Sequence, residues 1–78
     1  MIRIKICGLY RPEDIRYVNQ VKPDWCGFII NFFQSHRSLS PDRVRELRRG
    51  LDAAVVPVGV FVDQPLEGLE KAAGLAAV

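Results

Sequence analysis

A cysteine stands where the first apolar segment of the chain ends. Cys7 follows the alternating segment 2–6 and is followed at once by Gly8. A cysteine thiol is partly ionised at neutral pH, and its thiolate acts as a base, a nucleophile or a metal ligand. Lys5 precedes it by two residues and shares its face of a strand, where a positive charge favours ionisation. Cys7 is the strongest candidate for a base or nucleophile.

Both cysteines also have a structural interpretation. Free cysteine is among the most buried residue types and often packs as a small hydrophobic residue. For Cys7 this alternative stays open. It is favoured for Cys26, which stands early in a second apolar run, away from the end at which ligands are expected to bind.

A polar loop with the sequence NFFQSHRSLS (31–40) supplies two further candidates. It contains His36 and Arg37 among small polar residues. The planar guanidinium of arginine suits a carboxylate or a phosphate, while histidine can titrate near neutral pH or donate a hydrogen bond. The alternative is a solvated pair without function, because many loops are polar. Asp63, which stands ahead of Pro65, is interpreted as a helix cap.

Three strand-like segments must position these residues. Residues 2–7 alternate between apolar and other side chains, which is typical of a strand. The runs WCGFII (25–30) and AAVVPVGVFVD (53–63) are nearly all apolar, as expected for strands that are covered on both faces. Pro57 is expected at the beginning of the third strand, because proline cannot donate a hydrogen bond to a sheet.

Helix signals follow each of these strands. Pro12 opens a segment with apolar residues at helical spacing. Ser40 and Pro41 predict the N-cap and first residue of a second helix, which Gly50 ends. A third helix is expected after Pro65.

The alternation of strands and helices predicts an α/β protein with a parallel sheet, because parallel strands need crossover helices. The 78 residues allow one domain, and a free-standing three-stranded sheet leaves two unpaired edges. We therefore expect residues 1–78 to form a single, incomplete βαβαβα domain. The last segment, 74–78, is either the frayed end of the third helix or the start of a fourth strand.

In repeated βα units, ligands bind at the carboxyl ends of the strands. This rule is expected to bring together three stretches of the chain, each of which follows a strand. They are residues 7–10, 31–38 and 63–64.

Composition and charge exclude several classes of protein. A net charge of +2 with mixed signs gives no basic patch for nucleic acid, and no glycine-rich phosphate loop is present. One histidine and two separated cysteines predict no metal site and no disulfide framework. No segment has the roughly 18 apolar residues that span a bilayer, and the start MIRIKICG is unlike a signal peptide. We expect a cytoplasmic protein with reduced thiols.

Nearly the whole chain resembles phosphoribosylanthranilate isomerase, an enzyme family of tryptophan biosynthesis. Five segments carry the resemblance through their order and spacing: KICGL (5–9), RPEDI (11–15), CGFII (26–30), SHRSLSP (35–41) and VGVFVDQ (58–64). The family has a (β/α)8 TIM barrel, and its complete members are more than twice as long. The resemblance therefore implies a partial TIM barrel that consists of the first three βα units.

The resemblance also implies an isomerase activity without cofactor or metal. The reaction is the Amadori rearrangement of N-(5-phosphoribosyl)anthranilate to 1-(2-carboxyphenylamino)-1-deoxyribulose 5-phosphate. Cys7 would be its general base and Arg37 would hold the anthranilate carboxylate, with His36 as a further substrate-binding candidate. The family's general acid and phosphate site come from later strands, outside this chain, so Asp63 is not assigned the acid role.

Three residues depart from the pattern of the family and bear on how the substrate is positioned. Tyr10 stands where threonine is frequent, which removes a possible cap oxygen. His36 stands where lysine or proline is common, and Ser38 replaces a frequent tyrosine.

Two other hypotheses stay open. In one, the chain is a non-catalytic half-barrel fragment that acts only by assembly, through its exposed strand edges, with a second copy or a missing piece. In the other, it is a small α/β binding module that shares only the order of strands and helices. Under the leading hypothesis we expect little or no turnover by the isolated chain, because loss of a general acid alone removes about 10²–10⁴-fold.

Overall fold

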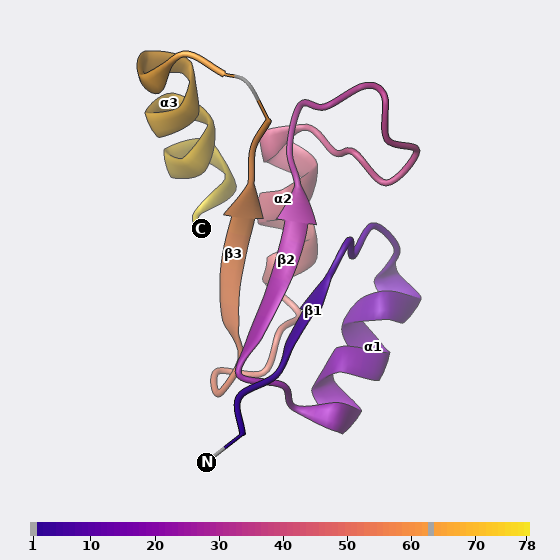
Figure 1. Cartoon of the computed structure of the whole chain (residues 1–78). Helices are drawn as coiled ribbons and strands as arrows, with labels where there is room; N and C mark the ends of the chain where they lie inside the picture. The colour runs from indigo at the N-terminus through magenta and orange to yellow at the C-terminus, as the bar shows by residue number, and fades with distance from the viewer. Residues whose placement is uncertain (1, 63) are drawn as a thin grey trace.

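A computed structural model describes residues 2–62 and 64–78 and has the predicted alternation of strands and helices (Figure 1). The strands are β1 (Lys5–Cys7), β2 (Trp25–Ile29) and β3 (Val56–Val60). The helices are α1 (Pro12–Val21), α2 (Pro41–Arg48) and α3 (Leu66–Ala76).

The first strand is shorter than the alternating sequence predicted. It begins at Lys5 and not at Ile2, because only Lys5–Cys7 pair with β2. Ile2 and Ile4 lie outside the ladder with exposed side chains. Alternation therefore identified the strand, whereas the available partner set its length.

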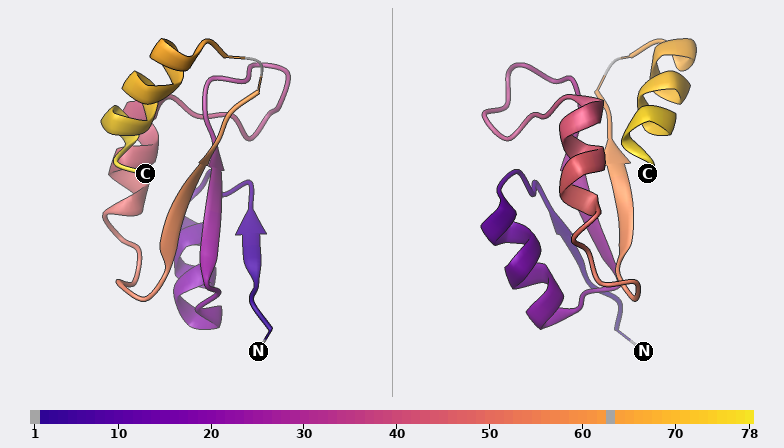
Figure 2. Two further views of the ribbon diagram at one scale, coloured as in Figure 1. Left: turned by 60° about the vertical axis from the view of Figure 1, so that its left-hand side comes forward. Right: turned by 180° about the vertical axis from the view of Figure 1, so that it is seen from behind.

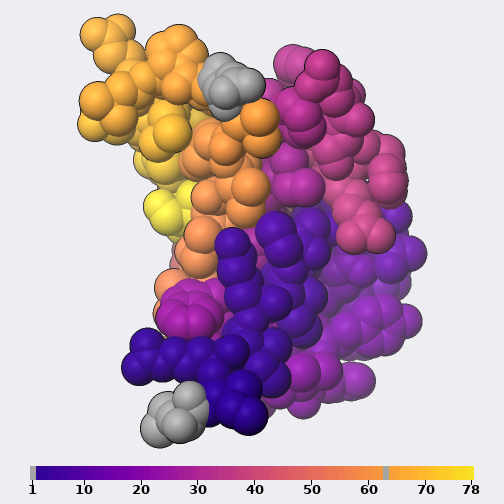
Figure 3. Space-filling view, viewed as in Figure 1, coloured from indigo at the N-terminus to yellow at the C-terminus, as the bar shows by residue number. Residues whose placement is uncertain are grey.

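The three strands form a parallel sheet in the order β1-β2-β3. Cys7 pairs with Gly27, and Gly27 pairs with Val58. All three helices lie on one face of the sheet, as the side and rear views show (Figure 2). The other face is uncovered, and residues of the N-terminal segment and of β3 lie at the surface there (Figure 3).

The hydrophobic core lies between the sheet and the helices. Alternate residues of β2 and its extension face it, and Cys26, Phe28 and Ile30 are completely buried. Val44 of α2 is equally buried, and the remaining core side chains come from the loops and helices around it. Removal of a ring such as that of Phe28 from such a core costs about 3–5 kcal/mol.

The second helix begins where its sequence predicts. The Ser40 hydroxyl accepts a hydrogen bond from the Arg43 N–H at 3.3 Å, and Pro41 is the first helical residue. The helix ends at Arg48, two residues before Gly50.

The third helix extends into the segment for which two structures were considered. Residues 74–76 belong to α3, and Ala77 ends it in the left-handed conformation with φ of 58°. Most of the segment is therefore the end of a helix, and Val78 follows its cap. Ala72 and Ala76 are the buried residues of α3, whereas Leu66 is exposed. The cap interpretation of Asp63 lies outside the described residues.

In the described ranges, no helix combines the length and the apolar character needed to cross a membrane.

Candidate functional site

The two cysteines lie on opposite faces of the sheet. Cys7 is exposed at the carboxyl end of β1, on the uncovered face. Cys26 is completely buried under the helices, and this burial raises the pKa of its thiol from 9.0 to about 11, against a smaller lowering by the charge of Arg48. At neutral pH the Cys26 thiol is protonated and shielded, so Cys7 is the thiol that can meet a ligand.

A glycine on the neighbouring strand leaves room for the Cys7 thiol. A Cβ atom at Gly27 would point at the side chains of Cys7 and Lys5. The three residues therefore share the uncovered face, as the strand period predicted for Lys5 and Cys7.

The loop between β2 and α2 folds back over the end of β1. The Ser38 hydroxyl accepts a hydrogen bond from the Phe32 N–H at 2.8 Å, and the Asn31 N–H donates to the Leu39 carbonyl at 3.0 Å. These bonds close the loop, and the Arg37 side chain consequently lies next to Gly8. A Cβ atom at Gly8 would lie 3.2 Å from Arg37 Cδ and Nη1, and the φ of Gly8 is +85°. Both the close approach and the left-handed backbone favour glycine at this position.

Arg37 and Cys7 line one hollow. It has a volume of about 250 Å³ and is also lined by Gly8, Tyr10 and residues of α1. Within residues 2–62 and 64–78, Arg37 forms no ion pair. An unpaired guanidinium beside an exposed thiol can hold a carboxylate while the thiol acts on the same molecule.

His36 lies against Tyr10 and does not line the hollow. The two rings meet edge to face, with centroids 6.0 Å apart. Two residues that the sequence placed on different loops thus come into contact above the strand ends. Tyr10 was noted in the sequence only as a departure from a pattern, and its aromatic ring directly after the end of a predicted strand was the available signal.

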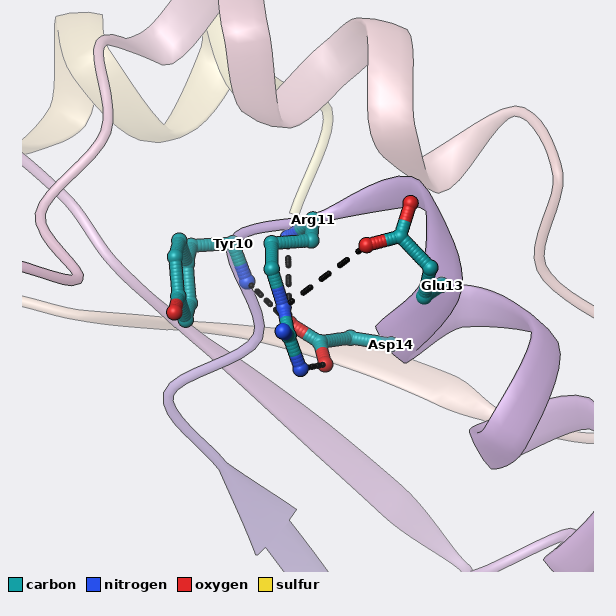
Figure 4. Close-up of polar contacts among 4 residues, drawn as sticks. All are labelled: Tyr10, Arg11, Glu13 and Asp14. Atoms are coloured by element: carbon teal, nitrogen blue, oxygen red, sulfur yellow. Dashed lines mark hydrogen bonds and ion pairs between the residues drawn. The ribbon is translucent and has the colours of Figure 1, made fainter.

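Asp14 fixes the loop that carries Tyr10 (Figure 4). Its Oδ2 accepts hydrogen bonds from the backbone N–H groups of Tyr10 at 3.1 Å and Arg11 at 3.0 Å, and its Oδ1 accepts one from Arg11 Nη2 at 2.9 Å. The Arg11 side chain, followed by the two backbone N–H groups, lowers the pKa of the Asp14 carboxyl below its ordinary value of 3.8. This carboxylate caps the start of α1 from its third residue, by accepting the N–H of the N-cap residue Arg11.

The third strand end joins the same edge through Gln64. Its side-chain amide donates a hydrogen bond to the carbonyl of Ile30 at 3.1 Å. The ends of β2 and β3 are thereby linked, while the adjacent candidate Asp63 is outside the described residues. In the part of the chain that the structure describes, no three His, Cys, Asp or Glu side chains are grouped to hold a metal ion.

The chain is similar in sequence to known isomerases. No family model matches it. The N-(5'-phosphoribosyl)anthranilate isomerase of Clostridium kluyveri is 48% identical over 67 residues, which are 86% of this chain and 33% of that protein. The isomerase of the same name from Thermoanaerobacter pseudethanolicus is 44% identical over 73 residues, 94% of this chain and 35% of that protein. The chain thus spans about a third of the length of these relatives.

Solved structures give the same result for the fold. Phosphoribosyl anthranilate isomerase from Thermus thermophilus matches 99% of this chain with a TM-score of 0.88 and 33% identity. The Thermotoga maritima enzyme matches all of it with a TM-score of 0.88 and 32% identity, and in each case 38% of the solved chain is covered. A further phosphoribosyl anthranilate isomerase structure, in complex with reduced 1-(o-carboxyphenylamino)-1-deoxyribulose 5-phosphate, matches with a TM-score of 0.88. The predicted partial TIM barrel is confirmed.

Proposed function

The chain is related to the phosphoribosylanthranilate isomerases over about a third of their length, and from this premise we propose that it is the N-terminal part of such an isomerase. Its share of the site is the base and the carboxylate anchor for the Amadori rearrangement of N-(5-phosphoribosyl)anthranilate. The observation that carries this proposal is that Arg37 and Cys7, which stands at the carboxyl end of β1, line one hollow.

Cys7 acts as the general base. Its thiolate takes the proton from C2 of the open-chain protonated imine, and the released electron pair forms the C1=C2 double bond of an enolamine as the C1=N double bond becomes single. The enolamine then yields the C2 ketone when its hydroxyl loses a proton and C1 gains one. The exposure of Cys7 supports this role, because a base must reach the carbon from which it takes the proton. The acid that opens the sugar ring and the phosphate site lie outside this chain.

Arg37 holds the carboxylate of the anthranilate ring. Its guanidinium is unpaired among the described residues, and a planar fork binds a carboxylate through two parallel hydrogen bonds. The adjacent His36 contacts Tyr10 and does not line the hollow. We retain His36 only as a candidate for contact with substrate at the rim of the site.

A completed barrel tests this function. Residues 1–78 replace the matching N-terminal part of the Clostridium kluyveri relative, and isomerase turnover is measured for the chimera and for its Cys7→Ser variant. We expect turnover by the chimera and a loss of about 10²–10⁴-fold in kcat for Cys7→Ser. Cys26→Ala is the matched control and keeps its kcat, because Cys26 lies on the other face of the sheet. A folded chimera without turnover, or a Cys7→Ser variant with normal kcat, would refute the proposal.

A second candidate is assembly without catalysis, and the uncovered sheet favours it. Among the described residues, β1 and β3 each pair on one side only, and the face opposite the helices has no cover (Figure 2). Such edges can pair with a second copy or with the remaining part of a barrel. Sedimentation of the 78-residue chain tests self-association. A folded monomer at high concentration counts against it.

A further inference from the structure

The Tyr10 ring stands between two guanidinium groups. Arg11 Cζ lies 5.2 Å from the ring centroid, and Arg37 Cζ lies 5.9 Å from it. Both distances are within the range of about 6 Å in which a cation is attracted to an aromatic ring. The His36 ring meets Tyr10 nearly at a right angle, with 83° between the ring planes. Tyr10 is thus the common contact of two arginines and a histidine.

Only one of the two arginines has its guanidinium available for a ligand. Arg11 is held by Asp14, with Nη2 and Oδ1 2.9 Å apart. Arg37 has no carboxylate partner among the described residues and reaches the hollow that contains Cys7. The contact with the Tyr10 ring therefore leaves the hydrogen-bond donors of Arg37 available to a ligand.

Tyr10 itself is a fixed support. Its N–H donates to Asp14, and the preceding Leu9 is 2% exposed. The N–H groups of Gly8 and Leu9 both donate to the Gly27 carbonyl, at 2.9 and 3.1 Å. The loop after β1 is therefore tied to β2 on one side and to α1 on the other.

We propose that Tyr10 is a positioning residue for Arg37. The ring on one side and the backbone of Gly8 on the other confine the Arg37 side chain, so that its fork faces the hollow before a ligand arrives. An arginine confined in this way loses less conformational freedom when it binds a carboxylate. That the ligand is the anthranilate carboxylate rests on the proposed function. The confinement of Arg37 does not.

A purely structural role for Tyr10 makes different predictions. If the residue only fills space in the loop, its loss lowers stability and leaves the substrate affinity of folded protein unchanged. If the ring positions Arg37, a phenylalanine keeps the effect and a leucine loses it, because only phenylalanine retains an aromatic face.

Kinetics of the completed barrel give the first test. For Tyr10→Leu we expect a rise in KM of about three- to tenfold with kcat nearly unchanged, the size of one cation–π contact, and near-normal values for Tyr10→Phe. A substrate analogue with aniline in place of anthranilate lacks the carboxylate, so its KM is expected to be insensitive to Tyr10→Leu. An unchanged KM in Tyr10→Leu, or equal rises in both variants, overturns the proposal.

Side-chain NMR gives a second test that needs no turnover. The Arg37 Nε–Hε group is expected to be ordered in the 78-residue chain and in the completed barrel, to stay ordered in Tyr10→Phe and to become mobile in Tyr10→Leu. Arg45, exposed on α2, is the mobile reference in the same spectra. If Arg37 is as mobile as Arg45 while the barrel is active, the positioning role is refuted and the proposed function stands. If Arg37 is ordered in a folded barrel without turnover, the proposed function is refuted and the positioning role stands.

Discussion

Gly27 lies so close to Cys7 that a Cβ atom at Gly27 would stand 2.8 Å from the Cys7 Sγ. Non-bonded heavy atoms prefer separations of about 3.5–4.0 Å, so any side chain at position 27 must displace the thiol. The two residues are direct partners in the β1–β2 ladder. A glycine on one strand therefore sets where the thiol on the next strand can lie.

Gly27→Ala is predicted to lower kcat in the completed barrel by about 10–100-fold. The new methyl group drives Cys7 into another rotamer, and a base misplaced by about 1 Å loses about that much rate. The free energy of unfolding should change little, because the displaced atom is the end of an exposed side chain. Steady-state kinetics and denaturant unfolding check both expectations.

Gly59→Ala is the matched control for that substitution. Its Cβ would lie 2.8 Å from the Phe61 ring and 2.9 Å from a Val78 methyl group, away from Cys7. We expect a loss of about 1–3 kcal/mol in stability through overpacking, with a normal kcat for the folded fraction. A normal kcat in Gly27→Ala would show that the thiol position is not set by this glycine.

Thiol labelling is predicted to distinguish the two cysteines. A disulfide reagent at neutral pH should modify Cys7 rapidly, whereas Cys26, completely buried, should react only when the chain unfolds. The number of fast-reacting thiols, followed by absorbance, should be one per chain and should fall to zero in Cys7→Ser. Two fast thiols in the folded chain would contradict the burial of Cys26.

The stability of the chain is predicted to fall between about pH 9 and pH 11 through Cys26. The thiol has its ordinary pKa of 9.0 when unfolded and a pKa of about 11 when folded. In this interval the unfolded chain has lost the proton that the folded chain keeps, so the unfolded state is favoured as the pH rises. The two pKa values correspond to a loss of order 2 kcal/mol at the upper end.

Cys26→Ala isolates this effect from the other groups that titrate in the same range. We expect this variant to be less stable by about 1 kcal/mol at every pH, because removal of the sulfur atom leaves a cavity. The contribution of the thiol to the pH dependence of its free energy of unfolding is absent. Denaturant unfolding at a series of pH values measures both slopes. If the two curves run parallel from pH 9 to pH 11, the Cys26 thiol is not responsible.

Sequence alone predicted the elements whose signals are local. Ser40 and Pro41 mark the start of α2 because a cap and a first turn depend only on neighbouring residues. The predicted length of β1 was wrong, because the length of a strand depends on which residues of its partner strand face it. The buried side of α3 could not be read from its larger apolar residues, because its buried residues are the small Ala72 and Ala76 whereas Leu66 is exposed.

The candidate site likewise contains some residues that the sequence alone could place and others that it could not. Cys7 and Arg37 could be placed at one end of the sheet from the order of strands and helices. The roles of Gly27 and Tyr10 could not be predicted, because they depend on the register between strands and on how the loop 31–40 folds back. Both are contacts between residues far apart in the sequence, which periodicity does not report.

Asp14→Ala is predicted to destabilise the chain by about 1 kcal/mol at neutral pH, the usual cost of a lost helix cap. Arg11 and two backbone N–H groups lower the pKa of Asp14, so its contribution is present above its unfolded pKa of 3.8 and is lost as the pH falls through the lower folded value. Unfolding of the two proteins should therefore converge in acid. Glu13→Ala is the control: Glu13 and Arg11 are exposed and 3.9 Å apart, so little change is expected. A difference that persists unchanged in acid would exclude a role for the carboxylate charge.

Arg37→Lys is predicted to raise KM in the completed barrel by about tenfold or more while kcat changes little. Lysine keeps the positive charge but has no planar fork, so the paired hydrogen bonds to a carboxylate are lost. The shorter reach of its charged group over Gly8 and Tyr10 weakens the remaining contact. Arg45→Lys makes the same chemical change at an exposed position on α2 and should leave both constants as they are. If the two substitutions have equal effects, or if Arg37→Lys lowers kcat at unchanged KM, Arg37 does not bind the substrate carboxylate through its fork.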